Sequence, residues 1–176
     1  LKKDYKVDDL VLLTPTNKGI NGTMAINKVI QEALNPKNGQ DYLEVNTGDD
    51  LIEYRVGDLI MNVQNRTVKK VTSQGDVEYY IANGESMVLK EVFDTYSIFE
   101  IEGNNIKIDN DDITNGSMQH GWCITAHKSQ GSEYKVAICL VPRQCAFQMN
   151  GNLLYTMTSR AKDYLLVLGD MSVINN

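Results

Sequence analysis

Six consecutive residues, Val136 to Val141, are apolar, and this run favours one class of fold. A strand with one face in water alternates apolar and polar residues, whereas a continuous apolar run is typical of a strand covered on both faces. Such strands belong mainly to parallel sheets with helices packed on them. A second run, Leu165 to Leu168, has the same character and ends at Gly169. The two runs therefore predict buried strands of an α/β fold.

The N-terminal region has the pattern of half a βαβ unit. The apolar run Leu10 to Leu13 ends in Thr14-Pro15 and leads into a glycine-containing loop, Lys18 to Gly22. Apolar residues then recur with helical spacing at positions 26, 29, 30, 33 and 34, and Asn35-Pro36 ends the pattern. Near the C-terminus the same alternation predicts a strand at 122–125 and a helix at 153–161. Strands that alternate with helices indicate a parallel sheet.

The middle of the chain has the pattern of an antiparallel β structure. Turn sequences at Gly57-Asp58, Asn83-Gly84 and Gly103-Asn104-Asn105 separate short apolar runs, and residues 87–93 and 96–101 are rich in branched and aromatic side chains. No helical period occurs between residues 77 and 108. We therefore predict a small antiparallel subdomain at residues 65–114, inserted into an α/β domain formed by residues 1–64 and 115–176.

Composition limits the class of protein. No stretch reaches the roughly 20 apolar residues that a membrane-spanning helix needs, and the polar start Leu1-Lys2-Lys3-Asp4 lacks the apolar core of a signal peptide. The three cysteines have no disulfide-framework spacing and fit reduced thiols in the cytoplasm. The net charge of −6 is unlike that of most nucleic-acid-binding domains, although a groove for a single strand needs only local cations. The chain does not begin with Met, and we expect it to be a fragment of a longer protein.

Two polar segments carry the side chains best suited to chemistry. The first, Trp122 to Glu133, is a strand that runs into a loop with hydroxyl, imidazole, ammonium, amide and carboxylate groups. It follows the carboxyl end of a strand, where open α/β sheets bind ligands. The second, Leu153 to Lys162, places Arg160 near the end of an apolar helix. Taken alone, Arg160 is most simply a cation that stabilises the end of that helix.

Together the two segments resemble motifs V and VI of superfamily-1 DNA helicases of the RecD type. Residues 127–133 are similar to the HKSQGSE signature of that family, and residues 155–162 are similar to YTAITRAK. Segments at 13–36, 57–65 and 83–85 resemble further family motifs in the same order. The chain thus resembles the C-terminal RecA-like motor domain of these helicases, of which the exodeoxyribonuclease V alpha subunit is one.

The resemblance implies two RecA-like domains, with ATP and Mg²⁺ in the cleft between them and single-stranded DNA across their top. It implies that Arg160 is the arginine finger, which reaches the γ-phosphate as negative charge develops there. It also implies nucleotide contacts for Gly131, Glu133 and Lys18, with Glu133 accepting from ribose hydroxyls. The residues implied to contact DNA are Thr14, Asn65, Thr125, His127, Lys128 and Ser129.

The inserted strands resemble the SH3-like subdomain of RecD-type helicases, with Asn65 at its entry. The sequence departs from the family in this region. Residues 66–81 are longer and more charged than the family pattern, and Glu85-Ser86-Met87 stands where the family prefers Asp-x-Gly. Ser159 replaces the usual Thr before Arg160, and this exchange keeps a hydroxyl at that position.

The chain has no Gly-x-x-x-x-Gly-Lys-Ser/Thr loop, the sequence that holds the β- and γ-phosphates and Mg²⁺. We therefore expect the chain alone to be inactive as an ATPase. Its expected partners are single-stranded DNA, the N-terminal RecA-like domain of the same parent and, in some assemblies, subunits of a nuclease complex, but no membrane. The parent is expected to be a cytoplasmic helicase that unwinds DNA 5′ to 3′ in recombination or repair.

The sequence also suggests alternatives to the helicase. A zinc site and a Cys–His hydrolase lack, respectively, the paired ligand spacing and the nucleophile turn that they require; the residues concerned are His120, Cys123, His127, Cys139 and Cys145. The third alternative is a degenerate helicase-like module that binds DNA or protein without motor activity. The presence of nucleotide-side residues such as Arg160 beside DNA-side residues favours a motor.

Overall fold

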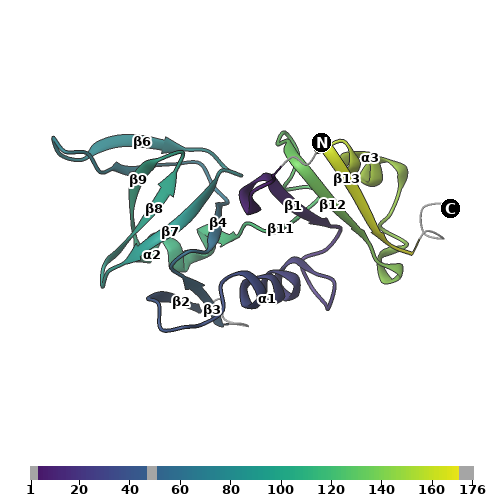
Figure 1. The fold of residues 1–176 in the computed structure, drawn as a ribbon, viewed down its shortest axis with the longest axis horizontal. Coiled ribbons are helices and arrows are strands. Elements are labelled where there is room, and N and C mark those ends of the chain that lie inside the picture. The colour runs from purple at the N-terminus through teal and green to yellow at the C-terminus, as the bar shows by residue number, and fades with distance from the viewer. Residues whose placement is uncertain (1–3, 47–50, 171–176) are drawn as a thin grey trace. The chain divides into compact units, whose positions relative to one another are not determined.

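The computed structural model describes residues 4–46 and 51–170, which form two compact units (Figure 1). The first unit contains the residues up to Ile30 and those from Trp122 onward, and the second contains Gln31–Gly121. Among the described residues, no helix is long and apolar enough to cross a membrane.

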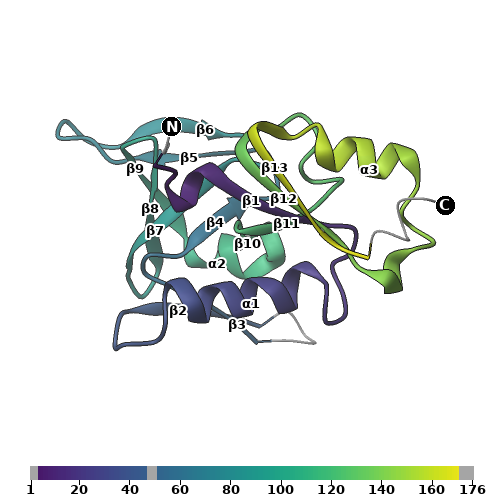
Figure 2. The same ribbon diagram turned by 45° about the vertical axis from the view of Figure 1, so that its right-hand side comes forward.

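The first unit is built on a four-stranded parallel sheet in the order β11-β1-β12-β13. Its strands are β1 (Leu10–Thr14), β11 (Cys123–Thr125), β12 (Tyr134–Val141) and β13 (Ala161–Gly169). Two helices accompany it, α1 (Thr23–Leu34) and α3 (Gly151–Thr158), and short 3-10 turns lie at Val7–Asp9 and Arg143–Cys145. Helix α3 packs on β12 (Figure 2). The predicted parallel α/β sheet is therefore confirmed.

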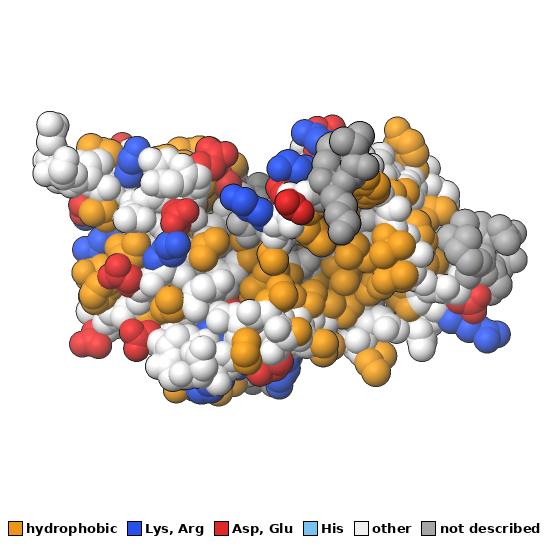
Figure 3. Space-filling view, viewed as in Figure 1, with side chains coloured by type: hydrophobic (Ala, Val, Ile, Leu, Met, Phe, Trp, Pro, Cys, Tyr) orange, Lys and Arg blue, Asp and Glu red, His pale blue; other side chains and the backbone are white. Residues whose placement is uncertain are grey.

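The two faces of this sheet differ in burial. Alternate residues of β1 and β12 on one face, such as Leu13 and Cys139, are fully buried, whereas their neighbours on the other face are half-buried. The prediction that 165–168 is a buried strand is wrong, because Tyr164, Leu165, Leu166 and Leu168 of β13 are 45–53% exposed. Strand β13 ends the sheet and pairs only with β12, so its side chains have neighbours on one side alone. Apolar side chains gather on the surface over these two strands (Figure 3).

The Asn27 side chain joins α1 to the parallel sheet within the first unit. The Asn27 carboxamide donates to the Cys123 carbonyl and accepts from the Cys123 backbone amide, both at 2.8 Å. Asn27 and Cys123 are both buried, so this pair of bonds satisfies polar groups that water cannot reach. The helix ends at Leu34, directly before the Asn35-Pro36 stop that the sequence predicts.

The second unit is antiparallel, as the sequence predicts, and its main sheet has seven strands in the order β10-β4-β7-β8-β9-β5-β6. The strands are β4 (Leu59–Asn62), β5 (Arg66–Lys70), β6 (Val77–Ile81), β7 (Ser86–Val92), β8 (Tyr96–Ile101), β9 (Asn104–Asp109) and β10 (Met118–His120). A separate hairpin joins β2 (Tyr42–Asn46) to β3 (Leu51–Arg55), and the short helix α2 (Asn110–Asp112) leads into a π turn at Ile113–Ser117. Buried residues such as Ile60, Leu89 and Phe99 form its core.

The second unit is larger than the insertion predicted at 65–114. Strand β4 precedes that range and β10 follows it, yet β4 pairs with both β7 and β10 in the antiparallel sheet. The predicted boundaries therefore fall inside one sheet, and the compact units divide at Ile30 and Trp122 instead. The pattern around 59–62 is a short apolar run, which does not show whether its neighbours are parallel or antiparallel.

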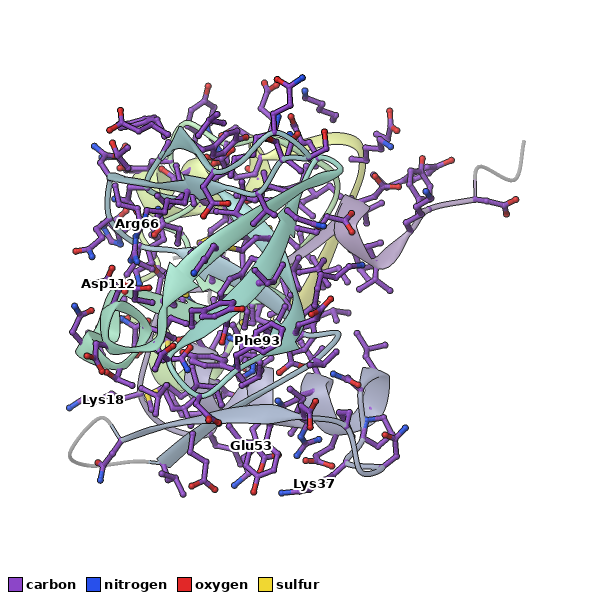
Figure 4. All side chains as sticks on the ribbon, turned by 90° about the vertical axis from the view of Figure 1, so that its left-hand side faces the viewer. Lys18, Lys37, Glu53, Arg66, Phe93 and Asp112 are labelled. Carbon is purple, nitrogen blue, oxygen red and sulfur yellow. The ribbon has the colours of Figure 1, made fainter. Side chains whose placement is uncertain are left out.

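The Gly57-Asp58 turn is hydrogen-bonded to several segments of the second unit. Gly57 has φ +98°, a conformation that side chains with a Cβ rarely adopt. The Asp58 carboxylate is fully buried and accepts hydrogen bonds from Gln31 Nε2 (2.6 Å), Asn35 Nδ2 (2.8 Å), the Arg55 backbone amide (2.8 Å) and His120 Nε2 (3.1 Å). At the surface of the same unit, Lys37 Nζ pairs with Glu53 at 2.7 Å (Figure 4).

Candidate functional site

The loop at 126–133 runs from the carboxyl ends of the strands in the parallel sheet to their amino ends. We call these two sides of the sheet the carboxyl edge and the amino edge. Strand β11 ends at Thr125, which pairs with Thr14 at the carboxyl end of β1. Strand β12 begins at Tyr134, which pairs with Ala161 at the amino end of β13. Most of the residues predicted to be functional therefore fall into two groups. The carboxyl-edge group, beside the end of β1, contains Thr14, Thr125, His127, Lys128 and Ser129. The amino-edge group, beside Ala161, contains Gly131, Glu133 and Arg160.

Arg160 is the central residue of the amino-edge group. It lies between α3 and β13, and its carbonyl accepts a hydrogen bond from the Tyr134 amide at 2.9 Å. Its guanidinium donates from Nε to the Thr156 carbonyl (3.0 Å), from Nη1 to the Ser132 carbonyl (3.1 Å) and from Nη2 to Ser159 Oγ (2.9 Å). These three bonds hold the side chain at the end of the loop, where β12 starts.

All three acceptors of the Arg160 guanidinium are electrically neutral, and no carboxylate of a described residue forms an ion pair with it. The nearest acidic group of the loop, Glu133, pairs with Lys162 Nζ at 2.8 Å. The hydrogen bond from Lys162 is the main cause that lowers the pKa of Glu133, and Arg160 adds a weaker attraction. The Arg160 cation is thus oriented by the protein but not neutralised by it, which leaves it able to attract an anion.

Gly131 lies in the same loop with φ +85° and no heavy atom within 4 Å of the place where a Cβ would stand. The backbone there is therefore open to a ligand, and the left-handed conformation explains why glycine occupies the position. Glu133 is exposed beside it. The structure thus brings together Gly131, Glu133 and Arg160, three of the four residues predicted to serve the nucleotide.

Lys18, the fourth residue predicted to serve the nucleotide, does not lie beside the other three. It follows the carboxyl end of β1 in the loop that leads to α1, whereas the other three lie toward the amino edge of the sheet. Its side chain is exposed and projects outward from the ribbon (Figure 4). The structure does not bring Lys18 together with Arg160, because the loop after a parallel strand and the loop before the next one open at opposite edges of the sheet.

Three hydroxyls of the carboxyl-edge group are buried and stabilise the loops. Thr14 Oγ1 donates to the Asn21 carbonyl and Ser129 Oγ donates to the Ala126 carbonyl, both at 2.7 Å. Thr125 Oγ1 accepts from the Lys128 amide at 3.3 Å. Thr14 and Ser129 have no exposed surface. The structure therefore places these hydroxyls in the framework of the site, where each is hydrogen-bonded to the backbone.

His127 and Lys128 are the exposed members of the carboxyl-edge group. Desolvation by surrounding protein atoms lowers the pKa of Lys128. Asn65, the remaining predicted DNA contact, belongs to the second unit, where it is exposed and its Oδ1 accepts from the Asn83 amide at 2.8 Å. The predicted DNA residues thus occur in both units.

A pocket of about 300 Å³ lies beside His127 in the first unit. Its wall contains apolar and polar side chains without Lys, Arg, Asp or Glu: Pro15, His127, Gln130, Gln148, Asn150, Asn152, Leu153 and Thr156. We name this hollow the amide pocket. Sequence reasoning predicted only His127 among these residues. The available signal was the amide-rich segment 144–152, which follows the carboxyl end of an apolar strand.

The three cysteines are buried in the first unit. Burial raises the pKa of Cys123 to about 12 and that of Cys139 to about 11, and it also raises the pKa of Cys145. Thiols with raised pKa values remain protonated and pack as small apolar groups. Among the described residues, no three His, Cys, Asp or Glu side chains are placed to hold a metal ion.

Comparison with known proteins shows that the region around Arg160 is similar to a helicase domain. Residues 120–168 match the family model described as the UvrD-like helicase C-terminal domain. Over 92% of its length the chain is 28% identical to the ATP-dependent RecD2 DNA helicase of Deinococcus radiodurans, of which it covers 20%. Over 90% of its length it is 27% identical to the RecBCD enzyme subunit RecD of Buchnera aphidicola, of which it covers 24%. The chain thus spans no more than about a quarter of these relatives.

Solved helicase structures have the same fold. A Bacteroides Pif1 helicase in complex with ADP-AlF3 and ssDNA matches 99% of this chain with a TM-score of 0.57 and 13% identity, over 46% of its own length. The Pif1 helicase of Candida albicans matches 94% of this chain with a TM-score of 0.52 and 13% identity, over 48% of its own length. These findings confirm the RecA-like fold and the resemblance to RecD-type superfamily-1 helicases.

Proposed function

We propose that this chain is the second motor domain of an ATP-dependent DNA helicase, in which Arg160 is the arginine finger and the carboxyl-edge group borders the single-stranded DNA. The observation that carries the proposal is the environment of Arg160. Its guanidinium is fixed by three neutral acceptors and has no carboxylate partner among the described residues. A structural arginine in an ion pair would have its charge neutralised, whereas a finger needs a free charge.

The amino-edge group fits the phosphate end of ATP. The cation of Arg160 stands beside the open backbone of Gly131, so a phosphate can approach both. Glu133 is exposed, and its carboxylate is available to accept from a ribose hydroxyl while Lys162 holds Oε2. Bound ATP supplies the phosphoryl group, and Arg160 stabilises the charge that develops on it during hydrolysis. No acidic cluster among the described residues fits Mg²⁺, so the metal and the phosphate-binding loop would come from the N-terminal RecA-like domain of the same parent.

The DNA part of the proposal is supported by exposed groups at the other edge of the sheet. His127 and Lys128 are exposed, and local cations are sufficient to bind a single strand even when the whole domain is acidic. The Bacteroides Pif1 helicase of similar fold was solved with both ssDNA and a nucleotide analogue. We extend the proposal to 5′–3′ unwinding in recombination or repair, on the basis of the RecD-type motifs at residues 127–133 and 155–162.

The decisive experiment measures DNA-stimulated ATP hydrolysis by the full-length parent carrying Arg160→Ala. We expect turnover to fall by a factor of about 10³ or more, because an arginine finger contributes that much, while single-strand affinity is retained. Arg160→Lys should recover little, since an ammonium cannot form the rigid fork of donors. The matched control is Arg143→Ala, which removes an exposed arginine of the same unit. Unaltered turnover in Arg160→Ala would refute the finger.

The direction of unwinding requires a separate measurement. The parent is offered duplexes that carry either a 5′ or a 3′ single-stranded tail, with ATP and Mg²⁺ present. We expect separation of the 5′-tailed duplex only. Preference for the 3′ tail would contradict the assigned polarity and would leave the role of Arg160 unaffected.

A further inference from the structure

We propose that the amide pocket holds one nucleobase of the bound single strand. The inference rests on the proposed function and adds a base site to the phosphate contacts expected near His127. It concerns only the first unit, in which the pocket lies entirely.

Four polar side chains of the amide pocket are free to bind a ligand. The side chains of His127, Gln130, Gln148 and Asn152 are exposed, and none of them forms a hydrogen bond with another described residue. By contrast, Asn150 Oδ1 accepts from the Leu153 amide at 2.9 Å. These four polar groups line one hollow of about 300 Å³, where a ligand can reach them together.

The chemistry of these groups matches a base better than a phosphate. A carboxamide offers both donors and an acceptor, and so does the edge of a nucleobase. A phosphodiester offers only acceptors, so it can use the N–H donors of these amides but not their acceptor oxygens. The wall of the pocket contains no Lys, Arg, Asp or Glu. Gln and Asn are the side chains that pair with adenine through two hydrogen bonds, while Pro15 and Leu153 supply apolar contact for the ring.

An exposed aromatic residue adjoins the pocket in sequence. Phe147 precedes Gln148 and is fully exposed, with a relative accessibility of 104%. A phenyl ring that covers no apolar surface of its own unit has no role in packing. Aromatic side chains that stack on bases are a general feature of single-strand binding. The position of Phe147 therefore supports a base, and not only a backbone, as the ligand of this region.

The test compares an ordinary strand with one that lacks bases. The affinity of the full-length parent for oligo-dA and for a fully abasic oligonucleotide of equal length is measured by fluorescence anisotropy. The Gln148→Ala/Asn152→Ala double variant should bind oligo-dA about ten-fold more weakly, as expected for the loss of two side-chain hydrogen bonds. Its affinity for the abasic strand should equal that of the wild type. Gln74→Ala, an exposed amide of the second unit, should change neither affinity.

Phe147 provides an independent variant. Phe147→Ala should weaken binding to oligo-dA alone, and Phe147→Trp should retain it, because the larger ring also stacks. Equal thermal unfolding of all variants checks that each is folded. Equal losses on both strands would show that the pocket contacts the sugar-phosphate backbone, and no loss on either would show that it contacts no DNA; both results overturn the base site. A wild-type parent that binds neither strand would instead refute the proposed function.

Discussion

Arg160 and Lys162 lie two positions apart but have different electrostatic surroundings. Lys162 pairs with Glu133, whereas Arg160 donates only to carbonyl and hydroxyl oxygens. The motif resemblance predicted which cation is functional. It did not show which cation pairs with the acidic residue of the loop, since that depends on how the start of β12 meets the end of α3. The structure therefore adds the electrostatic reason for the role that the motif implies.

Asp58 is a second residue whose structural role depends on residues far from it in the sequence. The sequence indicates only a turn at Gly57-Asp58, because the donors to its carboxylate come from residues 31, 35 and 120 as well as from Arg55. Burial by itself raises the pKa of Asp58. The hydrogen bonds from His120, from the Arg55 amide and from Asn35 outweigh this effect, and the pKa is lowered overall.

The lowered pKa of Asp58 predicts acid sensitivity. A group whose folded-state pKa is below its unfolded value stabilises the fold fully above the unfolded pKa, about 3.9 for Asp, and loses this contribution as the pH falls through the folded pKa. We expect the free energy of unfolding to decrease below about pH 4.

Asp58→Asn should lower stability at pH 7 by about 1–3 kcal/mol, since buried donors lose their partner, and should weaken the acid dependence. Urea denaturation across pH measures both, with the exposed Asp76→Asn as the control. Identical pH profiles for wild type and Asp58→Asn would contradict the assignment.

Helix α3 and strand β13 show which elements the sequence specifies well. The helix was predicted at 153–161 and is observed at Gly151–Thr158, so the apolar period identified it correctly and its ends were displaced by two or three residues. The strand was also predicted correctly in kind. Its burial was not, because a continuous apolar run does not show whether a strand is central or at the end of a sheet. Strand β13 is at the end.

The start of α3 gives a test at the level of the element. Asn150 caps the helix through the bond from the Leu153 amide to Oδ1, and replacing such a cap by Ala costs about 1 kcal/mol. We expect Asn150→Ala to lower the free energy of unfolding by that amount and Asn150→Asp to preserve it. Asn152→Ala, which changes a neighbouring amide that caps nothing, is the control. Chemical denaturation that shows no difference between Asn150→Ala and Asn152→Ala would show that the cap contributes nothing.

At the scale of the whole molecule, the sequence predicted two kinds of structure in one chain but divided them at the wrong residues. Strands β4 and β10 belong to the antiparallel unit, although they lie outside the predicted range 65–114. Strand β10 spans only Met118–His120, too short for any period to be visible. The partnership of β4 with β10 and β7 joins segments far apart in sequence, so local patterns do not reveal it.

The absence of a phosphate-binding loop predicts the behaviour of the isolated chain. The sequence contains no Gly-x-x-x-x-Gly-Lys-Ser/Thr, and a finger without a held nucleotide has nothing to act on. We expect purified residues 1–176 to release no phosphate from ATP with Mg²⁺ and single-stranded DNA, while the full-length parent does. A colorimetric phosphate assay with Arg160→Ala as the background control measures this. A metal-dependent rate above that background would contradict the assignment as a second motor domain.

By itself the sequence determined the kinds of secondary structure, the parallel and antiparallel regions and the loop and helix that carry the helicase-like motifs, because periodicity and motif spacing are local properties of the chain. Only the tertiary structure decided that the loop at 126–133 runs from the carboxyl ends of the strands to their amino ends, that Lys18 lies apart from Arg160, and that Thr14 and Ser129 are buried. It also decided that amides from distant segments share one pocket. The reason is physical: burial and electrostatic pairing depend on which strands become neighbours, and strand order is set by contacts between residues far apart in the sequence.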